Sequence, residues 1–220
     1  MRKSFDEQLK ELGAELTQMG ALCETAIANA AQALFEGDGR FAQEAVRADE
    51  EIDNRERKIE ALCLKLLLRQ QPVARDLRQI SSALKMITDM ERIGDQARDI
   101  AEITKYVNLQ HVEPALSIKE MAQHTIKMVM ESISAYVNRD LEQASAAIDH
   151  DDVVDALFDK VKGELIAMIA KNPAYGEQAL DLLMIAKYFE RIGDHATNIA
   201  EWVEFSLTGK HRADLQPEEK

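Results

Sequence analysis

The pentapeptide Glu-Arg-Ile-Gly-Asp occurs twice in this chain, at residues 91–95 and, 99 positions later, at residues 190–194. In each copy an isoleucine lies five residues beyond the aspartate, and a glutamate lies two residues beyond that. Upstream, residues 19–53 match residues 121–155 at an offset of 102, with Met, Ala and Asp at shared positions. Two matches whose offset changes by three at one loop indicate an internal duplication. The chain is therefore expected to fold as two copies of one unit.

The composition predicts that this unit is helical. The chain is rich in Ala, Leu, Ile, Met, Glu and Asp, and it has only 5% aromatic residues, 9 Gly and 4 Pro. Glycine, proline and asparagine clusters separate segments whose apolar residues recur at helical spacing. The predicted helices span residues 4–35, 41–70, 76–107, 117–138, 141–171 and 176–207.

We predict an all-α fold of two tandem antiparallel three-helix bundles, because short connections make consecutive helices run in opposite directions. Helices of about 30 residues are about 45 Å long at ~1.5 Å per residue, so the molecule is expected to be elongated. We assign the first bundle to residues 1–110 and the second to residues 115–208. Residues 209–220 form a polar tail that we expect to be mobile.

The charge pattern argues against two classes of partner. The formal net charge is −13, and no stripe of basic residues provides the contacts that nucleic-acid phosphates need, so direct nucleic-acid binding is not expected. No apolar run of about 18 residues is present, so membrane insertion is not expected either. Cys23 and Cys63 lie inside helical patterns and are predicted to be reduced core thiols of a cytoplasmic protein.

Each copy of the motif belongs to an acidic stripe. At about 100° per residue, Asp95 and Glu102 lie within about 40° of Glu91, and a core face with Met86 and Ile93 lies on the other side. If the chain folds back at residues 72–73, the preceding helix brings two aspartates to the level of this stripe. The second half repeats the arrangement. The aspartates of the preceding helices are Asp49 and Asp53 in the first half and Asp151 and Asp155 in the second.

Four carboxylates that converge must be neutralised, because they repel one another. Either one of them takes up a proton or a cation binds, and oxygen ligands suit Mg²⁺, Ca²⁺, Mn²⁺ or iron. The alternative is that the acids lie on a solvated surface and are balanced by Arg92, Arg98, Arg191 and Lys187. Asp99 of the first half is replaced by Asn198 in the second, which keeps an oxygen donor without the charge.

Two further residue types in the motif have simpler interpretations. A glycine inside a helix costs about 1 kcal/mol relative to alanine, so Gly94 and Gly193 are expected to mark the close approach of another helix. His195 points about 100° away from Asp194 and is expected to face solvent or to support a ligand from behind rather than to bind metal.

The sequence resembles the PhoU family, whose members are accessory regulators of the bacterial phosphate-specific transport system. The resemblance rests on the tandem three-helix repeat, the doubled motif and the turn Arg-Gln-x-Pro-x-Ala-x-Asp-Leu-Arg at residues 69–78, and it covers residues 5–208. It implies a cytoplasmic, non-enzymatic negative regulator of phosphate uptake and of the phosphate-starvation regulon. Such a protein would link the ATPase subunit of the phosphate ABC transporter to the phosphate-sensing histidine kinase, and dimers would be common.

The resemblance also implies multinuclear metal binding, with Mg, Mn, Fe, Zn or Ca as the candidate ions. Carried over by position, the first predicted metal site consists of Asp49, Asp53, Glu91, Asp95 and Glu102. The second consists of Asp151, Asp155, Glu190, Asp194, Asn198 and Glu201. Asn198 departs from the acidic pattern and puts the number of metal ions in the second site in doubt.

Two alternatives remain besides a metal-binding adaptor. One is a carboxylate-bridged di-iron enzyme or metal store, a class that uses Glu-x-x-His on paired helices. Glu91 and Glu190 are each followed three residues on by glycine, which argues against this class. The other is a plain scaffold whose acidic residues keep it soluble.

Overall fold

The computed structural model describes residues 2–70, 72, 74–107 and 115–212, and this part of the chain is all-helical, as predicted. The predicted linker at 108–114 and the end of the tail, 213–220, lie outside the described residues. The elements are α1 (Arg2–Glu36), α2 (Gly39–Gln70), α3 (Ala74–Ile103), α4 (Ala115–Asn138), α5 (Leu141–Asp149), α6 (Asp151–Lys171), the 3-10 turn η2 (Pro173–Tyr175) and α7 (Gly176–Thr208).

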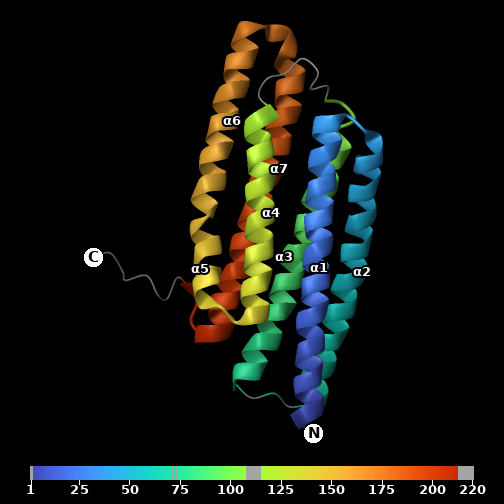
Figure 1. Cartoon of the computed structure of the whole chain (residues 1–220), viewed down its shortest axis with the longest axis vertical. Coiled ribbons are helices and arrows are strands. Elements are labelled where there is room, and N and C mark those ends of the chain that lie inside the picture. Colours follow the sequence, from blue (N-terminus) through green and yellow to red (C-terminus); the bar gives the residue numbers. More distant parts are fainter. Residues whose placement is uncertain (1, 71, 73, 108–114, 213–220) are drawn as a thin grey trace, which may run out of the picture.

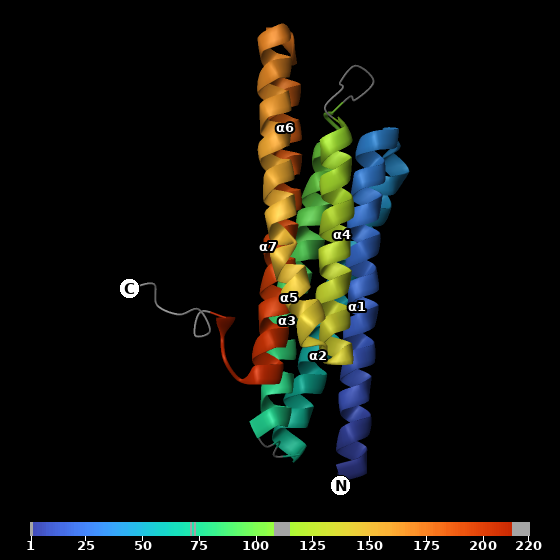
Figure 2. The same ribbon diagram turned by 60° about the vertical axis from the view of Figure 1, so that its left-hand side comes forward.

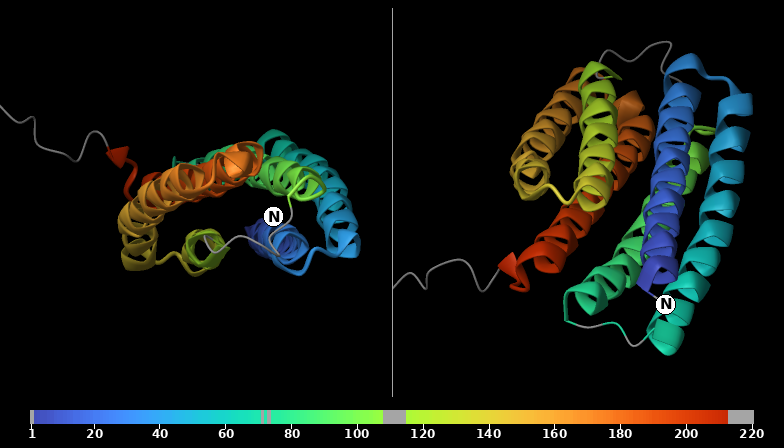
Figure 3. Two further views of the ribbon diagram at one scale, coloured as in Figure 1. Left: turned by 90° about the horizontal axis from the view of Figure 1, so that it is seen from above. Right: turned by 60° about the horizontal axis from the view of Figure 1, so that its bottom comes forward.

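The helices form two bundles that lie side by side along their length (Figures 1 and 2). The first bundle contains α1, α2 and α3, and the second contains α4, the α5–α6 pair and α7. Seen from above, α6, α7, α3 and α2 form one curved row, and α4 and α1 both lie on the inner side of its curve (Figure 3). The structure thus confirms the elongated pair of bundles, and it joins them through α3 against α7 and α1 against α4.

One hydrophobic core runs through both bundles. The core face predicted for the third helix is buried: Met86, Met90, Ile93 and Ala97 have no exposed surface. The apolar stripe of α1 packs into the same core as the buried side chains of α4 and α7. Among the described residues, no helix is both long enough and apolar enough to span a membrane.

The register between α3 and α7 brings the two copies of the motif together. Asp89 accepts a hydrogen bond from the amide of Asn198 (3.2 Å), and Asp99 is hydrogen-bonded to the phenol of Tyr188. Asp89 and Asp99 lie five residues either side of the glycine in the first motif. Tyr188 and Asn198 flank the glycine in the second motif in the same way. This crossed pairing places the two motifs at the same level on adjacent antiparallel helices.

The motif glycines allow the neighbouring helix of each bundle to come close, as predicted. A Cβ atom on Gly94 would lie 2.8 Å from Oδ1 of Asp49 and 3.0 Å from Cδ1 of Ile52, both on α2. A Cβ atom on Gly193 would lie 3.3 Å from Oδ1 of Asp151 on α6. In both bundles the glycine therefore lies against the aspartate that the sequence placed opposite the motif.

The helix predicted over residues 141–171 is wrong in one respect, because it is interrupted at His150. The side chain of Asp140 caps α5 by accepting a hydrogen bond from the backbone N–H of Gln143. His150 ends α5, and its Nε2 lies 2.6 Å from Nδ1 of His124 on α4. The acidic pair that follows, Asp151 and Asp152, stands in the first turn of α6, where the helix dipole stabilises negative charge.

The described part of the tail, residues 209–212, contacts the second bundle. Gly209 adopts a left-handed conformation (φ 77°) and ends α7. Arg212 then folds back and forms ion pairs with Asp149 (3.1 Å) and Glu204 (3.4 Å). These charge contacts tie the beginning of the tail to the second bundle.

Replacing Gly94 with Ala should lower the free energy of unfolding by about 1–3 kcal/mol, because the new methyl group overpacks the contact with Asp49 and Ile52. Gly193→Ala should cost less, since its nearest contact is 3.3 Å instead of 2.8 Å. Gly163→Ala is the matched control: no atom lies within 4 Å, so it should stabilise the helix by up to about 1 kcal/mol. Urea titration followed by circular dichroism measures all three, and equal effects at 94 and 163 would contradict the packing explanation.

Candidate functional site

The first acidic cluster lies in the groove between α2 and α3. Asp49 and Asp53 come from α2, and Glu91 and Asp95 come from α3. Spacing of four residues on each helix puts both carboxylates of a pair on the same face. The fold-back predicted from the sequence placed Asp49 opposite residue 96, and the structure places it against residues 94–98.

An arginine links the two sides of the first cluster. Nη1 of Arg98 lies 2.6 Å from Oδ2 of Asp49, and Nη2 of Arg98 lies 2.5 Å from Oδ1 of Asp95. Asp49 is only 2% exposed, while the side chain of Arg98 is 35% exposed, so this ion pair between two helices is partly buried. The other oxygen of Asp49, Oδ1, is buried against Gly94 and has no hydrogen-bond partner. A buried carboxylate oxygen without a partner leaves a place for a further proton or cation.

The carboxylates of the first cluster act on one another's protonation. Burial raises the pKa of Asp49, Arg98 opposes this shift, and the negative charges of Asp95 and Asp53 add to it. Burial likewise raises the pKa of Glu91, with further contributions from Asp95, Glu56 and Asp53. The five acids therefore form one electrostatic unit.

Glu56 is a member of this unit that the sequence reasoning missed. Burial and the charge of Asp53 raise its pKa, and it acts in turn on Glu91. The signal was present, because Glu56 follows Asp53 by three residues and so lies on the same face of α2. It was overlooked because its equivalent in the second half is Phe158, so the repeat does not mark the position.

The second acidic cluster lies in the groove between α6 and α7. Burial, followed by the charges of Asp155 and Asp194, raises the pKa of Asp151 to about 6, and the nearby hydroxyl of Thr197 opposes the shift. Burial and then Glu190 raise the pKa values of both Asp155 and Asp194. The four acids predicted to converge in this half do so.

The two clusters face the same side of the molecule. The grooves α2–α3 and α6–α7 both belong to the curved row of helices, and α1 and α4 cover its inner side (Figure 3). The partly exposed carboxylates therefore open onto the outer side of the row. The crossed pairing of α3 with α7 keeps the two clusters at one level on this surface.

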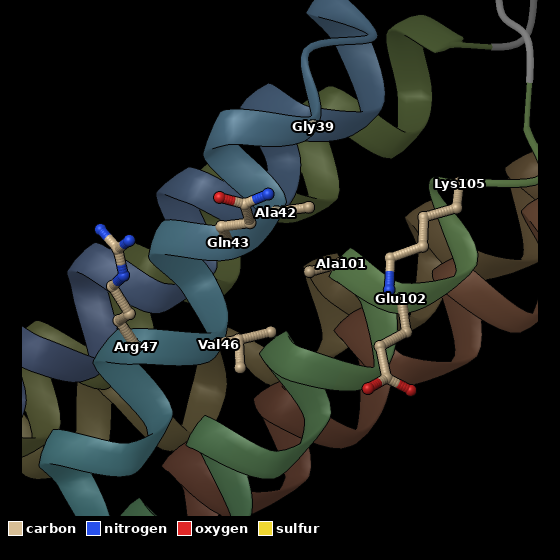
Figure 4. A pocket seen from close by; sticks show the side chains of 8 residues that line it. All are labelled: Gly39, Ala42, Gln43, Val46, Arg47, Ala101, Glu102 and Lys105. Carbon is tan, nitrogen blue, oxygen red and sulfur yellow. The ribbon is translucent and has the colours of Figure 1, made fainter.

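Three residues of the predicted sites lie apart from the clusters. Glu102 is exposed and lines a pocket of about 410 Å³ at one end of the α2–α3 groove, with Lys105 just beyond the end of α3 and Gln43 and Arg47 on α2 (Figure 4). The charge of Glu201 raises the pKa of Glu204, although burial of Glu204 is the larger cause of that shift. Glu102 also raises the pKa of Asp99, as Asp95 does, so Asp99 links it to the first cluster.

The third of these residues, Asn198, takes part in the contact between the bundles. Its amide donates a hydrogen bond to Oδ1 of Asp89. Nδ1 of His195 lies 2.9 Å from the same oxygen. The expectation that His195 faces solvent or supports a ligand missed this contact, because only the packing of α3 on α7 creates it.

The acidic clusters fit a hard cation in donor chemistry, since every side chain in them supplies oxygen. In the described part of the chain, however, no three or more His, Cys, Asp or Glu side chains are gathered closely enough to hold a metal ion as they stand. Side-chain rotation would have to complete a coordination shell. The metal assignment of these residues therefore stays a prediction.

Comparison with known proteins identifies the family. The model of the PhoU domain matches twice, at residues 16–104 and 118–203. The chain belongs to the PhoU family. Each match falls on one of the two bundles, so the duplication seen in the sequence is a duplication of the PhoU domain.

Relatives in this family are similar over nearly their whole length. The Phosphate-specific transport system accessory protein PhoU homologs of Clostridium acetobutylicum and Caulobacter vibrioides are 36% and 34% identical, covering 95% and 98% of this chain and 96% and 94% of their own. The crystal structure of PhoU from Pseudomonas aeruginosa superposes with a TM-score of 0.88 at 31% identity and covers 94% of this chain and all of its own. The fold and its organisation are thus those of PhoU proteins.

Replacing Asp151 with Asn should stabilise the protein at pH 7.5. The folded-state pKa of about 6 exceeds the usual 3.8, so the folded state binds more protons between these values and stability falls as pH rises through them. Removing the carboxylate should raise Tm by a few degrees at pH 7.5 and change it little at pH 4. Thermal melts at the two pH values measure this. The exposed neighbour variant Asp152→Asn is the control, and an equal gain in both variants would contradict the assignment.

Proposed function

We propose that this protein is a non-enzymatic negative regulator of phosphate uptake and of the phosphate-starvation regulon. The observation that carries the proposal is the full-length agreement with PhoU proteins, in both domains and in the doubled motif. The relatives are named as accessory proteins of the phosphate-specific transport system, which supports a role beside a transporter rather than as one.

The proposed mode of action is that of an adaptor in the cytoplasm. One partner is the ATPase subunit of the phosphate ABC transporter, and the other is the phosphate-sensing histidine kinase. An elongated surface on which two acidic clusters are presented side by side supports this proposal, because it can engage two partners or a symmetric one. A homodimer is part of the proposal and would double that surface.

Divalent-cation binding at the two acidic clusters is the second part of the proposal. Its support is the raised pKa of five of their carboxyl groups and the partnerless Oδ1 of Asp49. When bound, an ion would neutralise the repulsion between the acids and hold the paired helices together. Asp53, Asp95, Asp155 and Asp194, which are at least partly exposed, are the residues best placed to turn toward it.

A di-iron enzyme or metal store is the less favoured function. Gly94 and Gly193 stand where the histidine of a Glu-x-x-His motif would be needed. The structure gives these positions another use, since each glycine admits the neighbouring helix. We therefore interpret any bound metal as structural or regulatory.

Deleting the gene should derepress phosphate-starvation genes in phosphate-rich medium, because the repressing link between transporter and kinase is lost. A reporter fused to a starvation-induced promoter measures this, and re-expression of the intact chain should restore repression. Affinity capture with tagged protein should recover the transporter ATPase and the kinase. Unchanged reporter expression in the deletion strain would refute the regulatory proposal, and failure to capture either partner would refute the adaptor mode.

Adding Mn²⁺ or Mg²⁺ to metal-free protein should raise Tm, because a ligand that binds only the folded state stabilises it. The double variant Asp53→Asn/Asp155→Asn should lose most of this shift. Glu50→Gln/Glu142→Gln, which removes two exposed acids, is the matched control and should retain it. Elemental analysis of the purified protein completes the test, and a Tm that no candidate ion moves would refute metal binding.

A further inference from the structure

The pocket at the end of the α2–α3 groove has a counterpart in the second bundle that is already filled. There Arg212 bridges α5 and α7, and its guanidinium pairs with Asp149 (3.1 Å) and Glu204 (3.4 Å). At the offsets of the duplication, 102 for α2 and 99 for α3, these two acids correspond to Arg47 and Lys105. Both cations line the pocket of the first bundle. We propose that this pocket binds a carboxylate, with the charges of the second bundle's contact reversed.

The two places are equivalent in the packing of their helices as well as in sequence. Ala42 of α2 is buried, and so is its equivalent on α5, Ala144. On the other side of the groove, Ala101 of α3 and its equivalent on α7, Ala200, have no exposed surface. The same small residues let the helices approach in both bundles. A side chain that enters either groove therefore meets equivalent positions, and only the charges differ.

The cation next to α3 has no partner of its own in the described part of the chain. No described carboxylate lies within ion-pair distance of the ammonium of Lys105. Glu102 also lines the pocket, but its equivalent Glu201 is a glutamate too, so this position does not distinguish the two grooves. In the second bundle, Arg212 opposes the rise that burial causes in the pKa of Glu204. A carboxylate in the first pocket would be the corresponding counter-charge for Lys105.

Arg47 is the second cation, and its present contact is one that a ligand can replace. Its Nη1 lies 2.5 Å from Oε1 of Glu44, which belongs to the same helix. The two side chains are 65% and 51% exposed, and ion pairs this exposed contribute little to stability. Figure 4 shows the guanidinium at the rim of the pocket, directed away from Lys105 on the opposite wall. We therefore expect Lys105 to bind the carboxylate first and Arg47 to turn from Glu44 toward it.

The expected ligand is a single glutamate or aspartate side chain. Its counterpart, Arg212, reaches the second groove on a short segment that follows the end of a helix at Gly209. A pocket of about 410 Å³ admits a side chain of this kind, and contacts between charged partners are stronger than neutral ones.

Two sources can supply this carboxylate. One is this chain, because the residue equivalent to Arg212 at the offset of 99 is Glu113, which lies outside the described residues. The other is an acidic segment of a partner protein, for which the pocket would be a docking point. The chemistry is the same for both sources, and it does not depend on the proposed adaptor role.

The chain's own carboxylate is tested by reversing charges one at a time. If Glu113 is the ligand, Lys105→Glu should lower Tm by a few degrees, because repulsion replaces attraction. Adding Glu113→Arg should restore Tm, since the pair then copies the contact between Glu204 and Arg212. Lys65→Glu changes an exposed lysine near the other end of α2 and is the matched control. It should leave Tm unchanged, with or without Glu113→Arg.

An external carboxylate is tested by titrating ¹⁵N-labelled, full-length protein with a peptide of residues 206–213 that carries Arg212→Glu. Amide shifts should change around residues 42–47 and 101–105. The apparent affinity should fall by about tenfold in Lys105→Glu, the factor for one lost charge-assisted contact, and should be unchanged in Lys65→Glu. The same peptide without the substitution is the control, because its arginine would face Lys105.

The two arms separate the sources of the ligand. Peptide-induced shifts in the unsubstituted protein assign the pocket to an external segment. Shifts that appear only in Glu113→Gln, together with the restored Tm, assign it to this chain's own carboxylate. The inference is overturned if neither arm responds to the charge of Lys105, or if both peptides bind equally well. The reporter assay of the deletion strain does not enter this test, so either proposal can fail alone.

Discussion

The close contact between each motif glycine and a buried aspartate is the constraint on which the rest of the structure depends. Asp49 can lie against α3 only because Gly94 has no side chain at that point. The contact fixes how deeply α2 packs on α3, and thereby the level at which the carboxylates meet. The same relation holds for Asp151 and Gly193 in the second bundle, with a slightly wider gap. Glycine weakens a helix, but at these two positions it sets how closely the helices that form the charged groove approach each other.

Duplication turns this local contact into a surface. Because α3 and α7 run antiparallel with crossed pairing of Asp89 with Asn198 and of Asp99 with Tyr188, the two grooves come to one level of the molecule. The pairing also explains why position 198 carries an amide instead of a carboxylate: Asn198 donates a hydrogen bond to Asp89, which an ionised aspartate could not do. The two copies differ in their charged contacts: Arg98 pairs with Asp49 and Asp95 in the first cluster, and Lys187 pairs with Glu190 in the second.

Much of the candidate site could be predicted from the sequence. Fold-back at a known turn fixes which residues of two antiparallel helices face each other, so the convergence of Asp49 with the first motif and of Asp151 with the second followed from numbering alone. Glu102 and Glu201 were grouped with these acids because they share a helix face, but each lies about two turns further along its helix. The helical angle tells on which face a residue lies but not how far along the helix axis it lies. Likewise, the ion pairs of Arg98 depend on rotamers and packing that no periodicity specifies.

By itself, the sequence determined the helices, their duplication and the pairing of helices within each bundle, because these follow from periodicity, breakers and short connections. Only the tertiary structure decided that the bundles lie side by side, that both acidic grooves open on the same face, and that His195 and Asn198 meet Asp89 across the interface. Contacts between bundles depend on the shapes of surfaces far apart in the chain. Helical spacing describes one helix at a time, and these contacts form only when two of them pack.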